Sequence, residues 1–93
     1  MNLLYNVGKG ALCPPKLIHL KYSGANSDAP KLAIVGKGVT FDTGGLNIKP
    51  GASMSDMHLD KSGACISLGL FKWITDMQIP INVSCVLTLA ENA

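Results

Sequence analysis

The sequence is poor in charged residues. They make up 15% of its 93 residues, against roughly 25% in an average soluble domain. The formal net charge of +2 comes from lysines scattered along the chain. There is no basic run of the kind that binds nucleic acid. We therefore expect no nucleic-acid partner.

Long apolar runs are also missing. No stretch approaches the ~20 apolar residues of a membrane span, and the N-terminal segment lacks the basic and apolar regions of a secretory signal. We therefore expect no membrane partner and a cytoplasmic location. The three cysteines show no Cys-x-x-Cys spacing, which argues against a thiolate zinc site. We expect them to be reduced and buried as small hydrophobic residues.

Several common motifs are absent as well. Neither GxxxxGK[ST] nor GxGxxG occurs, so nucleotide binding by a minimal α/β unit is a poorly supported alternative. The two histidines, His19 and His58, lack HExxH spacing, which disfavours a histidine zinc site. A GxSxG nucleophile elbow is missing too.

Apolar residues, by contrast, are abundant and make up 47% of the chain. A chain this short buries only somewhat more than about 60% of its unfolded surface. We therefore expect one modest core. The excess of apolar residues is explained if the chain belongs to a larger body whose other elements cover its surfaces.

The first half of the chain indicates two strands. Residues 1–15 end in two prolines and are expected to be a connector. Apolar and polar residues alternate over Lys16–Tyr22, which predicts a strand with one solvated face. Leu32–Gly36 is a continuous apolar run, typical of a strand covered on both faces. The glycines that follow predict irregular structure through Ala52.

The second half indicates a helix and a further strand. Ser62–Met77 is apolar around most of a helical circumference, which predicts a buried helix. Ile81–Leu89 has the alternation of a strand. Strand, loop, helix and strand together form a βαβ crossover, which predicts a parallel pair with a right-handed connection. The fold class is therefore α/β, with short strands around this crossover and one buried helix.

The stretch Lys31–Asp60 has the composition of a functional site. It places Lys37, Asp42, Lys49 and Asp60 among glycines directly after the apolar run. In open α/β sheets, ligands bind beyond the carboxyl ends of the strands. We therefore expect the loop that leaves this strand to carry a binding or catalytic site.

The two residue types in this loop suggest metal chemistry. Asp42 and Asp60 offer oxygen donors that suit Mg²⁺, Mn²⁺ or Zn²⁺, although loop and N-cap positions also favour aspartate. Lys37 could bind a metal ion as a neutral amine, and Lys49 could remain charged and polarise a carbonyl group. Both lysines could instead be ordinary solvated residues. His58 could line a pocket or simply be solvated.

A longer sequence pattern indicates the function more specifically than these single residues do. Residues 35–64, VGKGVTFDTGGLNIKPGASMSDMHLDKSGA, resemble the signature region of the leucyl aminopeptidases, a family of two-metal exopeptidases. The similarity extends back through PPKLIHLKYSG and forward to INVSCVLTLAEN. The resemblance implies part of a three-layer sandwich that hydrolyses N-terminal, leucine-like residues from peptides. It further implies two divalent ions, Zn²⁺ or Mn²⁺ with Mg²⁺ or Co²⁺ as alternatives, and a homohexamer.

The resemblance also implies individual roles. Lys37 resembles the lysine ligand of the more loosely held metal ion, and Asp60 resembles another ligand of that ion. Asp42 resembles the carboxylate that bridges both ions. Lys49 resembles the catalytic lysine that contacts the substrate carbonyl and stabilises the tetrahedral intermediate. Met57 resembles a wall of the pocket for the substrate's first side chain.

Two departures qualify this expectation. The family usually has Arg-Ala-Asp-Met-Gly-Gly around the last ligand, where residues 58–63 are HLDKSG, so Lys61 adds a positive charge beside a cation site. A second acidic motif, Asn-Thr-Asp-Ala-Glu-Gly-Arg, is expected beyond Ala93. Residues 1–93 are therefore interpreted as a partial catalytic domain that holds half of the site and is inactive alone. The alternative is a truncated, non-catalytic α/β fragment that acts only in interaction or assembly.

Overall fold

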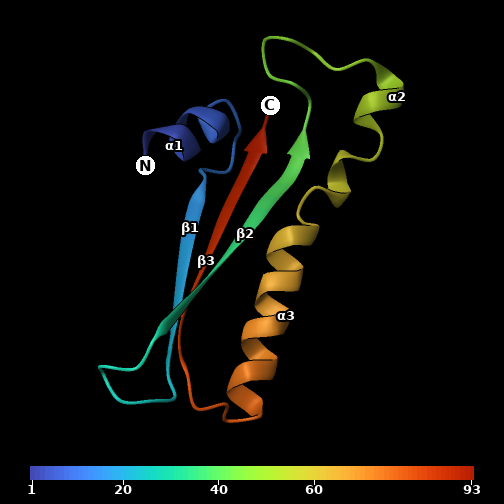
Figure 1. Ribbon diagram of the computed structural model, residues 1–93. Coiled ribbons are helices and arrows are strands. Elements are labelled where there is room, and N and C mark those ends of the chain that lie inside the picture. Colours follow the sequence, from blue (N-terminus) through green and yellow to red (C-terminus); the bar gives the residue numbers. More distant parts are fainter.

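The computed structural model describes residues 1–93 as a three-stranded sheet flanked by helices (Figure 1). None of the helices combines the length and the apolar composition that crossing a bilayer requires. The elements, in chain order, are α1 (Asn2–Gly8), β1 (Lys16–Ser23), β2 (Lys31–Asp42), α2 (Gly51–Met54), the 3-10 helix η1 (Met57–Leu59), α3 (Ser62–Asp76) and β3 (Asn82–Asn92).

The sheet has the order β1-β3-β2. β3 lies in the centre, antiparallel to β1 and parallel to β2. The parallel pair and the α/β class are therefore confirmed. Because β2 and β3 are parallel, their carboxyl ends lie at the same edge of the sheet, where Asp42 pairs with Asn92.

β2 is much longer than predicted. The expectation of irregular structure from Gly36 onward is wrong, since the strand continues through Gly38 to Asp42. A Cβ atom on Gly36 would lie only 2.7 Å from the Cα atom of Ala64 in α3. One on Gly38 would overlap the Leu89 side chain. These glycines allow close packing between the strand and its neighbours, which is a different use of glycine from loop formation.

Helices lie over both faces of the sheet. On one face Ala64 of α3 packs with the buried Cys85 and Leu87 of β3. Thr88 and Ala90, at alternate positions of β3, instead line an apolar cavity of about 410 Å³ together with α1. Side chains alternate between the faces of a strand, so α1 and α3 cover opposite faces. This helix-sheet-helix arrangement agrees with the expected three layers.

The expectation that residues 1–15 are only a connector is wrong. α1 forms because Leu3, Leu4 and Val7 recur at helical spacing, and all three line the apolar cavity against the sheet. The prolines that suggested a connector, Pro14 and Pro15, lie beyond the end of this helix.

Burial is less complete than predicted. α3 forms where it was expected, but it is buried along one side only, at Ala64, Ser67 and Ile74. On its outer side Ile66 is 71% exposed and Trp73 is 55% exposed. The reason is that a single three-stranded sheet can cover only one side of a helix.

β2 differs from the expectation in the same way. α3 packs against one face of the strand at Gly36, whereas Val35, which points to the other face, is 70% exposed. Of the three cysteines, Cys85 is buried as expected, whereas Cys13 and Cys65 are exposed.

Candidate metal and catalytic site

The candidate site lies where β2 ends. Two glycines with left-handed backbone conformations, Gly44 (φ 95°) and Gly45 (φ 69°), turn the chain directly after Asp42 and Thr43. The Lys49 N–H group then donates a hydrogen bond to the Thr43 carbonyl at 2.8 Å. This loop therefore returns Lys49 to the end of the strand.

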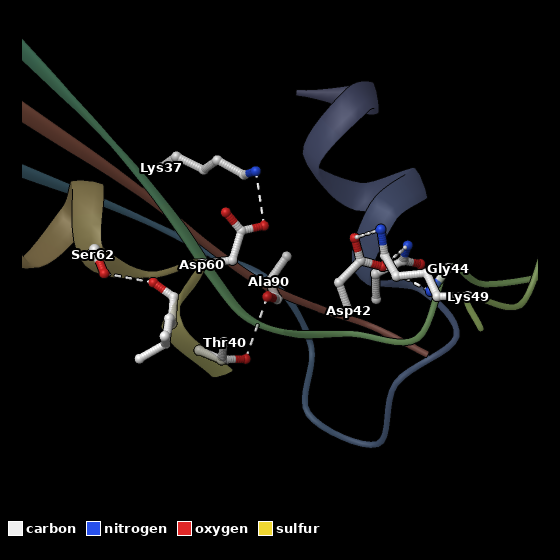
Figure 2. A network of polar contacts seen from close by, with 10 residues as sticks. Lys37, Thr40, Asp42, Gly44, Lys49, Asp60, Ser62 and Ala90 are labelled. Atoms are coloured by element: carbon white, nitrogen blue, oxygen red, sulfur yellow. Dashed lines mark hydrogen bonds and ion pairs between the residues drawn. The ribbon is translucent and has the colours of Figure 1, made fainter. Parts of the chain in front are cut away.

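Asp42 is held by several contacts. Its Oδ1 atom accepts hydrogen bonds from the Gly44 N–H group at 2.8 Å and from Asn92 Nδ2 at 2.7 Å. Its Oδ2 atom lies 3.6 Å from Lys49 Nζ. Figure 2 shows the two side chains pointing toward one another. Asp42 thus stabilises the loop through Oδ1, as aspartates in loops often do. Its other carboxylate oxygen, Oδ2, faces Lys49.

The charge state of Asp42 reflects opposing influences. Partial burial alone would raise the pKa of its carboxyl group. The hydrogen bonds from Gly44 and Asn92 and the positive charge of Lys49 outweigh burial, so the pKa lies below the ordinary value of 3.8. Asp42 is therefore an anion at neutral pH, which is the state that a metal ligand requires.

Lys37 and Asp60 form a second ion pair. Lys37 Nζ lies 2.8 Å from Asp60 Oδ2 (Figure 2). The cap residue of α3 is Lys61, and no side chain caps this helix by a hydrogen bond, so the N-cap interpretation of Asp60 is wrong. The Lys37 side chain is 65% exposed, whereas that of Asp60 is 25% exposed.

Helix packing brings this second pair together. A Cβ atom on Gly63 would lie 3.2 Å from the Lys37 carbonyl oxygen. The glycine therefore allows the start of α3 to lie directly against β2, which places Asp60 beside Lys37 although the two residues are far apart in sequence.

The remaining candidates lie on or near η1. Met57 is partly buried, whereas His58 is exposed and its Nδ1 atom lies 3.2 Å from the Ser55 carbonyl oxygen. Lys61 Nζ donates a hydrogen bond to the His58 carbonyl. The extra positive charge of Lys61 is thus engaged by the backbone, while Asp60 pairs with Lys37.

The donor set fits a divalent ion only in part. The carboxylates of Asp42, at the end of β2, and Asp60, just before α3, are donors that suit a hard or borderline cation. Each of them already attracts a positive group, Lys49 or Lys37. However, no three residues among the histidines, cysteines, aspartates and glutamates come together in a group that could hold a metal ion. The two carboxylates therefore do not by themselves form a complete metal centre.

Asn92 is a site residue that sequence reasoning missed. Its side chain donates to Asp42, and its carbonyl oxygen accepts hydrogen bonds from the Thr43 N–H group at 2.9 Å and from Thr43 Oγ1 at 3.2 Å. An asparagine near the end of a chain gives no signal by itself. Its importance follows from the register that pairs it with Asp42.

Comparison with known proteins places the chain in a family. The family model described as "Cytosol aminopeptidase family, catalytic domain" matches residues 1–93. The probable cytosol aminopeptidase of Aquifex aeolicus is 49% identical over 92 residues, which are 99% of this chain and 19% of that protein. The chain thus spans about a fifth of the length of this relative.

Solved structures agree in fold. The cytosol aminopeptidase of Coxiella burnetii matches with a TM-score of 0.89 and 42% identity over 97% of this chain and 19% of that one. The bottromycin maturation enzyme BotP, in a complex with Mn, matches with a TM-score of 0.83 and 36% identity over 96% of this chain and 19% of that one. The chain therefore belongs to the cytosol aminopeptidase family.

Proposed function

We propose that the chain forms part of a two-metal aminopeptidase that hydrolyses N-terminal, leucine-like residues from peptides in the cytoplasm. The observation that carries this proposal is that two lysine–aspartate pairs form along the carboxyl-terminal half of β2, Lys37–Asp60 within the strand and Lys49–Asp42 at its end. The family of the chain supports the reaction class. In this proposal residues 1–93 are a partial catalytic domain.

Lys37, Asp42 and Asp60 are the proposed metal-binding residues. Asp42 directs Oδ2 away from its two N–H donors, which leaves this oxygen available to a cation. We propose Mn²⁺ or Zn²⁺ as the ions, with Mg²⁺ and Co²⁺ as alternatives, and the Mn complex of BotP supports a divalent ion. A pair of such ions supplies an activated water molecule and polarises the scissile carbonyl group.

Lys49 is the proposed catalytic residue. Its ammonium group carries N–H donors and no acceptor, and its side chain is 31% exposed, so one side remains open to a substrate. A hydrogen bond from Nζ to the scissile carbonyl oxygen would become stronger as negative charge develops there. Lys49 would therefore both bind the substrate and stabilise the oxyanion. Met57 is proposed to line the pocket for the first side chain, because a flexible thioether adapts to apolar groups.

We further propose that these residues alone do not complete the catalytic centre. Two carboxylates and a lysine leave two metal ions with few protein ligands, and no third acidic side chain joins the group. The peptide substrate and a homohexameric assembly belong, in this proposal, to the whole protein. Hydrolysis of a leucine amide by this chain, lost in Lys49→Ala, would contradict the proposed inactivity.

Calorimetric titration with Mn²⁺ tests the metal assignment. Asp42→Asn and Asp60→Asn should each weaken binding by about tenfold or more, because each removes a charged ligand. Asp76→Asn is the matched control, since Asp76 also pairs with a lysine but lies at the end of α3. Equal affinities for all three variants and the wild type would contradict the assignment.

A non-catalytic role in interaction or assembly is the second candidate. It is favoured by the apolar outer side of α3, where Ile66, Trp73 and Met77 are exposed, because exposed apolar patches often mark interaction surfaces. The two candidates differ in what they require. The enzyme depends on Asp42 and Asp60, whereas an interaction unit would keep its partner when both are replaced by asparagine.

A further inference from the structure

β3 ends in Asn92, which contacts both Asp42 and the residue that follows it. The Asn92 side chain donates from Nδ2 to Asp42 Oδ1 at 2.7 Å. The Asn92 carbonyl oxygen accepts from both the N–H group and the hydroxyl group of Thr43, the residue after Asp42. A single residue of the central strand therefore holds both the Asp42 side chain and the backbone that follows it.

The side-chain contact determines which oxygen of Asp42 is free. Oδ1 accepts from Gly44 and from Asn92, while Oδ2 faces Lys49. The terminal torsion of an aspartate is otherwise broad and poorly defined. Without the Asn92 donor, the Gly44 N–H group and the more distant Lys49 ammonium group would be the remaining contacts of the carboxylate. The direction of Oδ2 would then be less well defined.

The same residue also helps to hold the loop that carries Lys49. Thr43 is bonded to Asn92, and the Thr43 carbonyl accepts the Lys49 N–H group at 2.8 Å. Gly45 leaves room for the amide, since a Cβ atom there would lie 3.2 Å from Asn92 Oδ1. Asn92 is thus connected to Asp42 by its side chain and to the Lys49 loop by its backbone.

We propose that Asn92 is a positioning residue that directs Asp42 Oδ2 toward the metal site. This inference rests on the proposed function, because it takes Asp42 to be a metal ligand. Asparagine suits the role because its NH₂ group donates while its charge remains zero. An aspartate at this position would repel Asp42, and an alanine would leave it without the donor.

A Mn²⁺ titration of the 93-residue chain, followed by paramagnetic broadening of its amide resonances, tests the proposal. Asn92→Ala should weaken Mn²⁺ binding by about 10- to 100-fold, the usual effect of losing a residue that orients a metal ligand. Thr43→Val is the matched control. It removes the hydroxyl contacts to the Asn92 carbonyl and the Gly45 N–H group but keeps the Thr43 N–H contact and the contact between Asn92 and Asp42, so its affinity should remain close to that of the wild type.

The outcomes distinguish the positioning role of Asn92 from the assignment of Asp42 as a metal ligand. If Asp42→Asn abolishes Mn²⁺ binding and Asn92→Ala does not weaken it, the positioning role is overturned and the metal assignment stands. If the wild type and Asp42→Asn respond to Mn²⁺ identically, both claims fall. A loss in Thr43→Val as large as that in Asn92→Ala would show that binding is lost on any disturbance of this loop rather than through the contact of the Asn92 side chain with Asp42, which also overturns the positioning role.

A metal-free measurement covers the case in which Asn92→Ala does not fold. In the wild type, one side-chain amide proton of Asn92 should exchange slowly with solvent, and its resonance should move in Asp42→Asn. An Asn92 amide that exchanges at the solvent rate and does not respond to Asp42→Asn would overturn the proposal without any use of the alanine variant.

Discussion

Asp42 is the residue on which the candidate site depends most. Burial raises the pKa of its carboxyl group, and the contacts with Gly44, Asn92 and Lys49 lower it by more. Those contacts come from the following loop and from the end of β3. The pKa of this one carboxyl group therefore depends on how the loop and the end of β3 are placed at the carboxyl end of the sheet.

The lowered pKa of Asp42 predicts a pH dependence of stability. The pKa of the Asp42 carboxyl group in the folded chain lies below the unfolded value of about 3.9. Ionisation of Asp42 therefore stabilises the folded state, and this contribution is fully present above pH ~3.9. This contribution is lost as the pH falls through the lowered folded value. In urea titrations without metal, the difference in unfolding free energy between the wild type and Asp42→Asn should be largest at neutral pH and should shrink in strong acid. A difference that does not vary with pH would contradict this prediction.

Burial raises the pKa of the Cys85 thiol, which predicts low reactivity. Only the thiolate reacts readily with alkylating agents, and Cys85 is fully buried whereas Cys13 and Cys65 are exposed. Mass spectrometry after treatment with iodoacetamide should show Cys85 reacting at least ~100-fold more slowly than the other two, since reaction requires opening of the fold. In concentrated urea the three rates should converge. Equal rates in the folded chain would show that the core around Cys85 is not closed.

At the scale of elements, the contact between β2 and α3 builds the site. Gly36 and Gly63 allow the helix to lie directly against the strand. The strand supplies Lys37 and Asp42, and the segment just before the helix supplies Asp60. Wider spacing between the two elements would separate the Lys37–Asp60 pair.

A pair of glycine variants tests this close contact. Gly36→Ala should lower the unfolding free energy by about 1–3 kcal/mol, because its Cβ atom would lie 2.7 Å from Ala64 Cα and 2.8 Å from Ser67 Oγ. Gly69→Ala is the matched control on α3, since its Cβ atom would meet nothing within 4 Å. It should raise the unfolding free energy by about 0.5–1 kcal/mol through better helix propensity. Similar effects of both variants in urea unfolding would contradict the proposed packing.

The elements that could be predicted from the sequence are those with local signals. β1, α3 and β3 follow from the pattern of apolar residues. The parallel pairing of β2 with β3 follows from the order strand, helix, strand. The extension of β2 could not be predicted, because Gly36 and Gly38 are typical of a loop unless the approach of α3 is known. The exposed outer side of α3 was missed because its apolar composition is that of a covered helix.

The sequence singles out the candidate site residues but does not predict their contacts. Lys37, Asp42, Lys49 and Asp60 were selected by composition and resemblance, and the structure brings them together in two pairs. Which lysine pairs with which aspartate depends on how the loop folds back and how α3 packs. Asn92 could not be found at all, because its role depends on strand register.

At the scale of the whole molecule, the small core and the large exposed apolar surface are the main features. Only 11 of 93 residues are buried, so the single core is small. Solved relatives contain the same fold within chains of about five times the length, since the match covers 19% of the Coxiella protein. The surfaces that are exposed here therefore have ample additional chain to cover them in such proteins.

This exposure predicts that the chain by itself associates as its concentration rises. Exposed apolar patches of this kind promote self-association, and the outer side of α3 presents Ile66 and Trp73. In sedimentation experiments the wild type should exceed its monomer mass of 9.8 kDa, and the double variant Ile66→Lys, Trp73→Lys should shift toward the monomer. Lys72→Glu, on the same helix, is the control and should have little effect. A wild type that stays monomeric at high concentration would contradict the prediction.

The most direct test of the central claim is an anomalous diffraction experiment on crystals of the chain soaked in Mn²⁺. The proposed function predicts an anomalous peak at the carboxyl end of β2, within about 2.0–2.3 Å of a carboxylate oxygen of Asp42 or Asp60, the distance range of bound divalent ions. The peak should disappear in crystals of the double variant Asp42→Asn, Asp60→Asn. Ordered crystals that contain Mn²⁺ elsewhere on the chain, and none beside these two aspartates, would contradict the claim.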